Sequence, residues 1–327
     1  MVKINEIHFS ECIVSAPSST ANLGPGYDIF GLGIDALEDI VHLKVSERSS
    51  EYKNNVQIKI RGSGSESIPT DPEFNSSGKV AKEIISNYKL YKYDFIIDIE
   101  KNIPPGYGMG SSAASAVATA IAFNKIFGFD MNNRILLDYA AEGELASAGV
   151  KHYDNIAGCF FGGFVIVRNI PSLEFIKVKS PKDLNLVVCV PLIKVPKKKT
   201  EAARNILPET VPLYKMTQNL SNACTVVAGF FNNDIQMICS GINDCVIEPV
   251  RKKLIPCYDQ LKERSLNEGA LAFTISGAGP STIAFLNSKN KGSQVSRIME
   301  ETYEEHKIKC KTFICNVSNG AKITLLK

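Results

Sequence analysis

The segment "PPGYGMGSSAAS" at residues 104–115 places three glycines and two adjacent serines ahead of a run of small residues. It follows "DFIIDIEKNI" (94–103), whose alternating pattern predicts a strand, and it leads into a helix predicted over 111–127. Glycine leaves backbone N–H groups exposed and lets other atoms approach closely. The first helical turn adds unpaired N–H donors and a partial positive charge. Strand, glycine turn and helix together predict a site for an anion such as phosphate.

The spacing excludes two common nucleotide motifs. A P-loop needs Gly-Lys-Ser/Thr, but Gly110 is followed by two serines and Gly78–Lys79 by Val80. A dinucleotide fingerprint needs G-x-G-x-x-G, whereas these glycines are spaced G-x-G-x-G. Glycine spacing alone leaves a purely structural turn open as the alternative. The hydroxyls of Ser111 and Ser112, which suit phosphate or magnesium, and the alanine-rich helix favour phosphate.

Length and composition are those of an ordinary globular protein. The chain has 327 residues, enough for two domains or one large one, and 44% of them are hydrophobic. Its net charge of +3 is too small to predict a nucleic-acid or membrane partner. The basic run "KVPKKK" at 194–199 predicts a solvated loop, with attraction of an anionic ligand as the alternative.

Cysteine usage and the N-terminal residues predict a cytoplasmic protein. The nine cysteines are odd in number and include no Cys-x-x-Cys, which indicates reduced thiols. The opening residues "MVKINE" contain no apolar signal core. Asn124 and Lys125 interrupt the apolar stretch at 111–127, which therefore predicts a buried helix and not a membrane span.

Strands and helices alternate irregularly along the chain, which predicts the α+β class. Helices are expected over 77–88, 111–127, 132–148, 250–266 and 293–308, with two more within 214–240. Strands are expected at 5–15, 38–47, 56–62, 94–103, 162–167, 184–190, 270–277, 281–286 and 311–318, the last closing the chain. A break near 170–185 predicts two domains, 1–175 and 176–327.

Three motifs, in order, resemble those of the GHMP kinases, which include galactokinase, homoserine kinase and mevalonate kinase. The glycine turn resembles their second motif, and "SGAGPSTIAF" (276–285) resembles their third. "PSSTANLGPGYDIFGLGID" (17–35) resembles the first motif in its homoserine kinase form. The resemblance implies an N-terminal α+β domain with a left-handed βαβ crossover and a ferredoxin-like C-terminal domain, with ATP between them.

The homoserine kinase form implies transfer of the γ-phosphate of ATP to the side-chain hydroxyl of L-homoserine, a step in threonine biosynthesis. By this resemblance Asn22 and Asp28 contact homoserine. A small zwitterion needs a carboxylate for its ammonium group and cations for its carboxylate, and Asp28 suits the first of these. For Asp28 the alternative is a turn or cap residue.

Two further stretches carry the same resemblance. In "GELASAGVKHYDNI" (143–156), Glu144 is expected to bind magnesium together with Ser112, and His152 and Asn155 to lie by the substrate. Asn155 is expected at the reacting hydroxyl. An amide is no base, so solvent or a phosphate oxygen accepts the proton unless Asp154 does. The alternatives are a solvated Glu144 and a capping or core His152.

Arginines complete the expected substrate site. In "TEAARNILP" (200–208), Arg204 is expected to pair with the substrate carboxylate or the transferring phosphoryl group, since its planar fork suits either. Arg251, in "EPVRKKLIP", resembles a second arginine near the carboxylate, with a surface charge as the alternative. Gly277, in the third motif, is also expected at the substrate.

The resemblance assigns ATP to the glycine turn and to two positions before it. The expected nucleotide residues are Pro105, Gly106, Tyr107, Gly108, Met109, Gly110, Ser111, Ser112, Asn75 and Lys101. Tyr107, Met109, Tyr27 and Ala278 depart from the common motif residues, but none of these departures removes a charged catalytic group. A homodimer is expected by resemblance. The rivals are another GHMP kinase of mevalonate type and a catalytically inactive sensor on the same scaffold.

Overall fold

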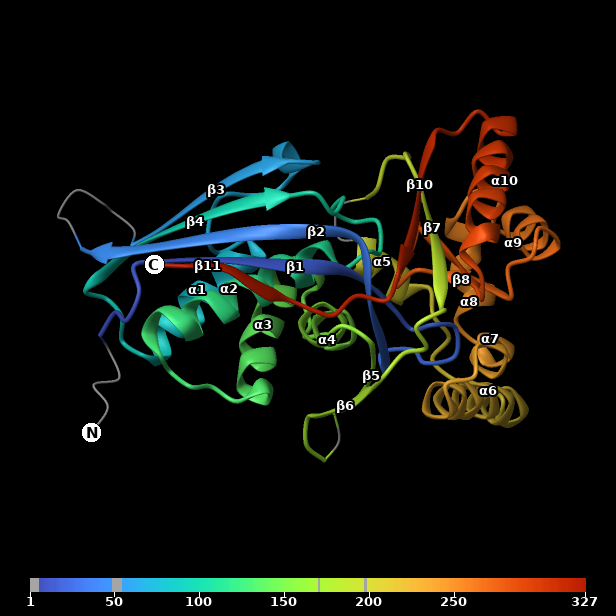
Figure 1. The fold of residues 1–327 in the computed structure, drawn as a ribbon, viewed down its shortest axis with the longest axis horizontal. Coiled ribbons are helices and arrows are strands. Elements are labelled where there is room, and N and C mark those ends of the chain that lie inside the picture. The colour runs from blue at the N-terminus through green and yellow to red at the C-terminus, as the bar shows by residue number, and fades with distance from the viewer. Residues whose placement is uncertain (1–5, 49–54, 170, 197–198) are drawn as a thin grey trace.

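The computed structural model describes residues 6–48, 55–169, 171–196 and 199–327, and two β-sheets organise it (Figure 1). The first sheet contains β1 (Glu11–Ala21), β2 (Phe30–Glu47), β3 (Val56–Gly62), β4 (Tyr93–Lys101), β5 (Phe164–Arg168), β6 (Glu174–Val178) and β11 (Lys322–Leu326). The second contains β7 (Asn185–Pro191), β8 (Ala272–Ile275), β9 (Thr282–Leu286) and β10 (Cys310–Asn316). The helices are α1 (Ser76–Asn87), α2 (Ser111–Phe127), α3 (Asn133–Ala148), α4 (Asp154–Phe161), α5 (Lys199–Asn205), α6 (Leu213–Asn232), α7 (Ile235–Gly241), α8 (Glu248–Arg251), α9 (Tyr258–Asn267) and α10 (Gly292–Glu305).

The first sheet has the order β11-β1-β2-β4-β3, with β5 and β6 continuing from β2. Its β3 and β4 are parallel and are connected through α1, and its other pairings are antiparallel. Helices α1 to α4 lie together on one side of the sheet (Figure 1). Of these, α2 and α4 pack on β1 and β2, and α1 and α3 pack against α2. Because α2 is rich in Ala and Ser, it fits between the strands and the neighbouring helices, and nearly all its residues are buried.

The second sheet confirms the ferredoxin-like expectation. Its strand order is β10-β7-β9-β8, and every pairing is antiparallel. In chain order the unit runs β7, α9, β8, β9, α10, β10, apart from the helices inserted after β7. Strand β7 is buried on both faces, and its alternating residues contribute to two different hydrophobic cores. The apolar run at 184–190 reflects this double burial.

Most expected elements are confirmed, and three expectations are wrong. The helix expected over 250–266 is interrupted, because Pro256 disfavours helical geometry at Ile255, which is extended. The strand at 311–318 does not close the chain, since β11 follows and pairs with β1. The strands expected at 5–15 and 38–47 have other bounds: β1 starts later, at Glu11, and runs into the first motif as far as Ala21, whereas β2 is longer and begins at Phe30.

The division at 175/176 stays a prediction. That position falls inside β6, and β11 belongs to the first sheet although it comes from the end of the chain. The two sheets also share a hydrophobic core, because Leu186, Val188 and Val190 of β7 belong to the same buried cluster as the strands of the first sheet.

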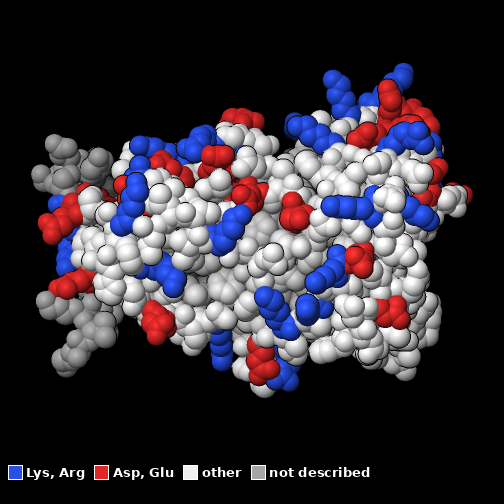
Figure 2. All heavy atoms as spheres, viewed as in Figure 1, with Lys and Arg blue, Asp and Glu red and all other residues white. Residues whose placement is uncertain are grey.

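All nine cysteines are free thiols, and five of them are buried. Within the described ranges, no helix combines the length and the apolar character needed to span a bilayer. On the face shown in Figure 2, basic and acidic side chains are interspersed.

Candidate active site

A cavity collects residues from all three motifs and from the stretches around residues 144–155 and 200–204. Every residue expected at the substrate lines this cavity, and so do both expected magnesium ligands. Most of them lie in loops or near the ends of helices, and Glu144 lies within α3. They are Asn22, Asp28, Ser112, Glu144, His152, Asn155, Arg204, Arg251 and Gly277.

The three motif loops are held together by hydrogen bonds. The Ser19 N–H donates to Met109 O (3.1 Å), and the Ser276 hydroxyl donates to Gly108 O (2.8 Å). The Asn22 amide links the first and third motifs, because its Nδ2 donates to Gly277 O (2.8 Å). Its Oδ1 accepts the Asp28 N–H (3.1 Å). Asn22 therefore orients Asp28 and Gly277 toward the cavity.

The glycine turn requires glycine for steric reasons. Gly106, Gly108 and Gly110 all have positive φ, which L-residues with side chains rarely adopt. A Cβ on Gly108 would come within 2.2 Å of Ser276 O, and one on Gly110 within 2.1 Å of Ser19 Oγ. Gly110 also caps the N-terminus of α2 in the left-handed conformation, without a side-chain hydrogen bond. The turn thus presents bare backbone, together with the start of a 17-residue helix, to the cavity.

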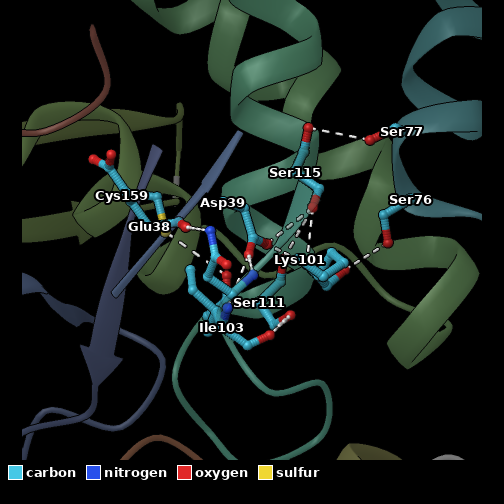
Figure 3. A network of polar contacts seen from close by, with 12 residues as sticks. Glu38, Asp39, Ser76, Ser77, Lys101, Ile103, Ser111, Ser115 and Cys159 are labelled. Carbon is cyan, nitrogen blue, oxygen red and sulfur yellow. Dashed lines mark hydrogen bonds and ion pairs between the residues drawn. The ribbon is translucent and has the colours of Figure 1, made fainter. Parts of the chain in front are cut away.

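A buried polar network fixes both ends of this turn (Figure 3). Lys101, 3% exposed at the end of β4, forms an ion pair with Asp39 and donates to Ser111 O (2.8 Å) and Ser115 Oγ (2.9 Å). Asp39 in turn accepts the N–H groups of Asn102 (2.9 Å) and Ile103 (3.0 Å). The Lys101–Asp39 ion pair therefore holds both the residues that precede the glycine turn and the first helical turn of α2.

This geometry does not support direct nucleotide contacts for Lys101 and Asn75, which stay predictions. Neither residue lines the cavity. Asn75 caps α1 by accepting the Gly78 N–H (3.2 Å), and its Nδ2 donates to Pro69 O (2.8 Å). Pro105, Tyr107 and Met109 also lie outside the lining, whereas the three glycines, Ser111 and Ser112 belong to it. The Ser111 hydroxyl is committed to Ile103 O (2.8 Å).

Two buried carboxyl groups, those of Glu144 and Asp154, line the cavity. Glu144 on α3 is buried, as the alanine-rich surroundings predicted, and Ser112 hydrogen-bonds to its carboxyl group. The Ser112 hydroxyl also lies 2.6 Å from that of Ser76. Burial raises the pKa of Glu144 to about 7, with a smaller contribution from Asp154. Burial, with repulsion from Asp28, likewise raises the pKa of Asp154 to about 7.

Asp28 and Arg204, which also line the cavity, form an ion pair. Arg204 Nη2 donates to both carboxylate oxygens of Asp28, at 2.7 and 2.6 Å, and lies 3.0 Å from His152 Nδ1. Since guanidinium is only a donor, His152 Nδ1 accepts, and the neutral ring carries its proton on Nε2. Burial and Arg204 lower the pKa of His152, which favours this neutral form. Among the described residues, nothing bonds to the buried Nε2.

Arg251 is buried, so the surface-charge alternative is wrong for it. Its guanidinium lies 5.0 Å from the centre of the Tyr27 ring, and that of Arg204 lies 5.2 Å from the same ring. Arg251 Nε donates to Ala203 O (3.2 Å). Tyr27 thus supports both arginines that the sequence assigned to the substrate.

Asn155 is more constrained than its expected role suggested. Its Oδ1 accepts from the Ser19 hydroxyl (2.9 Å), and its N–H donates to Asp154 Oδ1 (2.7 Å).

Sequence reasoning missed Asp39 because no motif contains it. Lys199 lines the cavity, whereas the basic run at 194–199 predicts a solvated loop. Lys197 and Lys198 of that run lie outside the described residues.

Known proteins are similar to this chain in sequence and in fold. The family model for the GHMP kinases N terminal domain matches residues 75–163, and the GHMP kinases C terminal model matches residues 226–305. Proteins named homoserine kinase from Methanopyrus kandleri and Methanococcus vannielii are 37% and 36% identical to this chain, over 95% of its length and 98% and 97% of theirs. The crystal structure of homoserine kinase from Cytophaga hutchinsonii matches with a TM-score of 0.88 at 32% identity, covering 97% of this chain and 98% of that one.

Proposed function

The chain belongs to the GHMP kinase family, and from this premise we propose that it phosphorylates the side-chain hydroxyl of L-homoserine. It is an ATP-dependent small-molecule kinase with an alcohol group as acceptor. It transfers the γ-phosphate of ATP, giving O-phospho-L-homoserine and ADP, in threonine biosynthesis. The observation that carries the proposal is the Asp28–Arg204 pair in the cavity beside the glycine turn, because it supplies one partner for each charge of an amino acid.

Homoserine binding replaces the ion pair between Asp28 and Arg204 with two ion pairs between the protein and the substrate. The substrate ammonium group takes Asp28, and its carboxylate takes Arg204 or Arg251. Because Asp28 and Arg204 already neutralise each other, the exchange leaves no charge without a partner, which limits the desolvation cost. The Nε2–H of His152, which lies beside Arg204, supplies a further hydrogen-bond donor for the substrate.

Nucleotide binding relies on the backbone of the glycine turn and on the N-terminus of α2. Phosphoryl transfer depends on positioning and charge stabilisation more than on covalent chemistry. The N–H groups of the glycine turn bind the phosphates, and the N-terminus of α2 stabilises the charge that develops on the transferring group.

Ser112 and Glu144 fit a magnesium site. Both offer oxygen ligands, and Mg²⁺ commonly takes only one or two protein ligands, keeping waters and substrate phosphates for the rest. Burial raises the pKa of Glu144, and a cation beside the carboxylate would reverse that shift. When bound with ATP, the ion neutralises phosphate charge.

The hydroxyl proton passes to solvent or to a phosphate oxygen in this proposal. Asn155 positions the hydroxyl, and its amide has no basic site. Asp154 is the alternative base, because its buried carboxyl group lines the cavity next to Asn155.

An acceptor assay tests the proposed function. Purified protein is mixed with Mg·ATP and L-homoserine, mevalonate or galactose, and ADP release is followed. We expect release with homoserine above the rate with ATP alone. Release with mevalonate instead supports the rival kinase, and binding of homoserine without turnover supports an inactive sensor; either result overturns the proposal. The cytoplasmic location and the homodimer stay predictions, and light scattering tests the second.

A further inference from the structure

Lys199, the first residue of α5, lies between the glycine turn and the third motif. Its ammonium group donates to the carbonyl oxygen of Gly279. That oxygen lies 2.8 Å from the point where a Cβ on Gly108 would stand, so the ammonium group is held close to the glycine turn. The preceding segment also packs on the turn, because the Tyr107 hydroxyl donates to Ile193 O (2.8 Å).

The cavity gives Lys199 no acidic partner. Within the part of the chain that the structure describes, neither Lys199 nor Arg251 forms an ion pair, whereas Arg204 is paired with Asp28. Burial, with repulsion from Arg251, lowers the pKa of Lys199 to about 7. A largely buried cation that pairs with no carboxylate is stabilised when an anion binds beside it.

We propose that Lys199 is a phosphate-binding residue that contacts the β- and γ-phosphates of ATP at the glycine turn. Its place beside Gly108 and Gly279 assigns it to the nucleotide and not to the amino acid, since the amino-acid charges are met by Asp28 and the two arginines. The ammonium group adds a positive charge to a site otherwise built from backbone N–H groups. This inference rests on the proposed position of the phosphates at the turn.

Equilibrium binding of AMP, ADP, ATP and L-homoserine to Lys199→Met and Lys199→Arg tests the assignment. Loss of a charge-assisted hydrogen bond weakens ADP and ATP binding to Lys199→Met by about 10- to 100-fold. AMP and homoserine, which lack these phosphates, bind as they do to the wild type and report an intact fold. Lys199→Arg, which keeps the charge, recovers most of the loss. Lys194→Met is the control, since Lys194 is exposed on the same segment and does not line the cavity.

Wild-type affinity of Lys199→Met for ADP and ATP overturns the assignment. So does a variant that loses homoserine instead, because Lys199 then belongs to the acceptor. The underlying phosphate position is tested separately with Gly108→Val. If that variant folds and binds ADP normally, the proposed nucleotide site fails, whatever Lys199 does.

Discussion

Replacing Lys101 with methionine separates two roles for this lysine. The sequence assigned it to ATP, whereas its contacts in Figure 3 assign it to the support of the glycine turn. Methionine keeps much of the side-chain volume and removes the charge. It also removes the donors to Ser111 and Ser115 and leaves Asp39 fully buried without its cation.

The expected loss in free energy of unfolding depends on the hydrogen bonds that Asp39 keeps in the variant. Removing one partner of a buried ion pair typically costs about 3–5 kcal/mol, because the other charge stays buried. Asp39 still accepts from Asn102 (2.9 Å), Ile103 (3.0 Å) and the Ser115 hydroxyl (3.1 Å). We therefore expect the lower end, about 3 kcal/mol less free energy of unfolding. ATP affinity should fall as a consequence of a loosened turn.

Urea unfolding of Lys101→Met, Asp39→Asn and the double variant measures this cost. The double variant should be less destabilised than the sum of the single changes by about 1–3 kcal/mol, because it removes both charges of one pair. Arg61→Gln is the control: Arg61 pairs with Glu100 at the surface, 69% exposed, so its loss should cost under about 1 kcal/mol. A Lys101→Met protein with unchanged stability and at least tenfold weaker ATP binding would refute the supporting role and restore the direct contact.

Three more outcomes follow from the cavity. Burial raises the pKa of Glu144 to about 7, and its carboxyl group must lose its proton to bind a cation. The Mg²⁺ concentration that gives half-maximal activity in the kinase assay should therefore rise as the pH falls from about 8 to 6. Glu144→Gln should abolish this pH dependence. Glu144→Ala should lower kcat about 100- to 1000-fold, whereas Asp154→Asn should keep substantial activity, and equal losses would indicate an aspartate base. Gly108→Ala should reduce kcat/KM more than Gly106→Ala does, since a Cβ at 108 meets Ser276 O at 2.2 Å and one at 106 meets only Val195 Cγ1 at 3.2 Å; equal effects would contradict the packing argument.

Elements with local determinants were predictable from the sequence. The helix at 111–127 has the bounds expected of it, because glycines at 110 and 128 adopt left-handed conformations at its two ends. Strand β11 was missed, because "KITLL" is short and its partner β1 lies at the other end of the chain. The break before α9 was visible as Pro256 but was outweighed by the helical spacing around it.

The site was predictable where motifs carry it. Asp28, Glu144 and Arg204 line one cavity although they come from three distant segments. Motifs do not state whether a lysine faces a ligand or the protein interior. Neither Lys101 nor Lys199 therefore lies where the sequence indicated: the first is buried in an ion pair, and the second lines the cavity.

The return of β11 to the first sheet affects how the chain folds as it leaves the ribosome. Thr324 donates to Ile13 O, a contact between residues 311 positions apart. Until that late segment emerges, β1 is the outer strand of its sheet, and its free N–H and C=O groups can pair with a neighbouring nascent chain. Pairing with β11 satisfies these backbone groups and removes the exposed edge of β1.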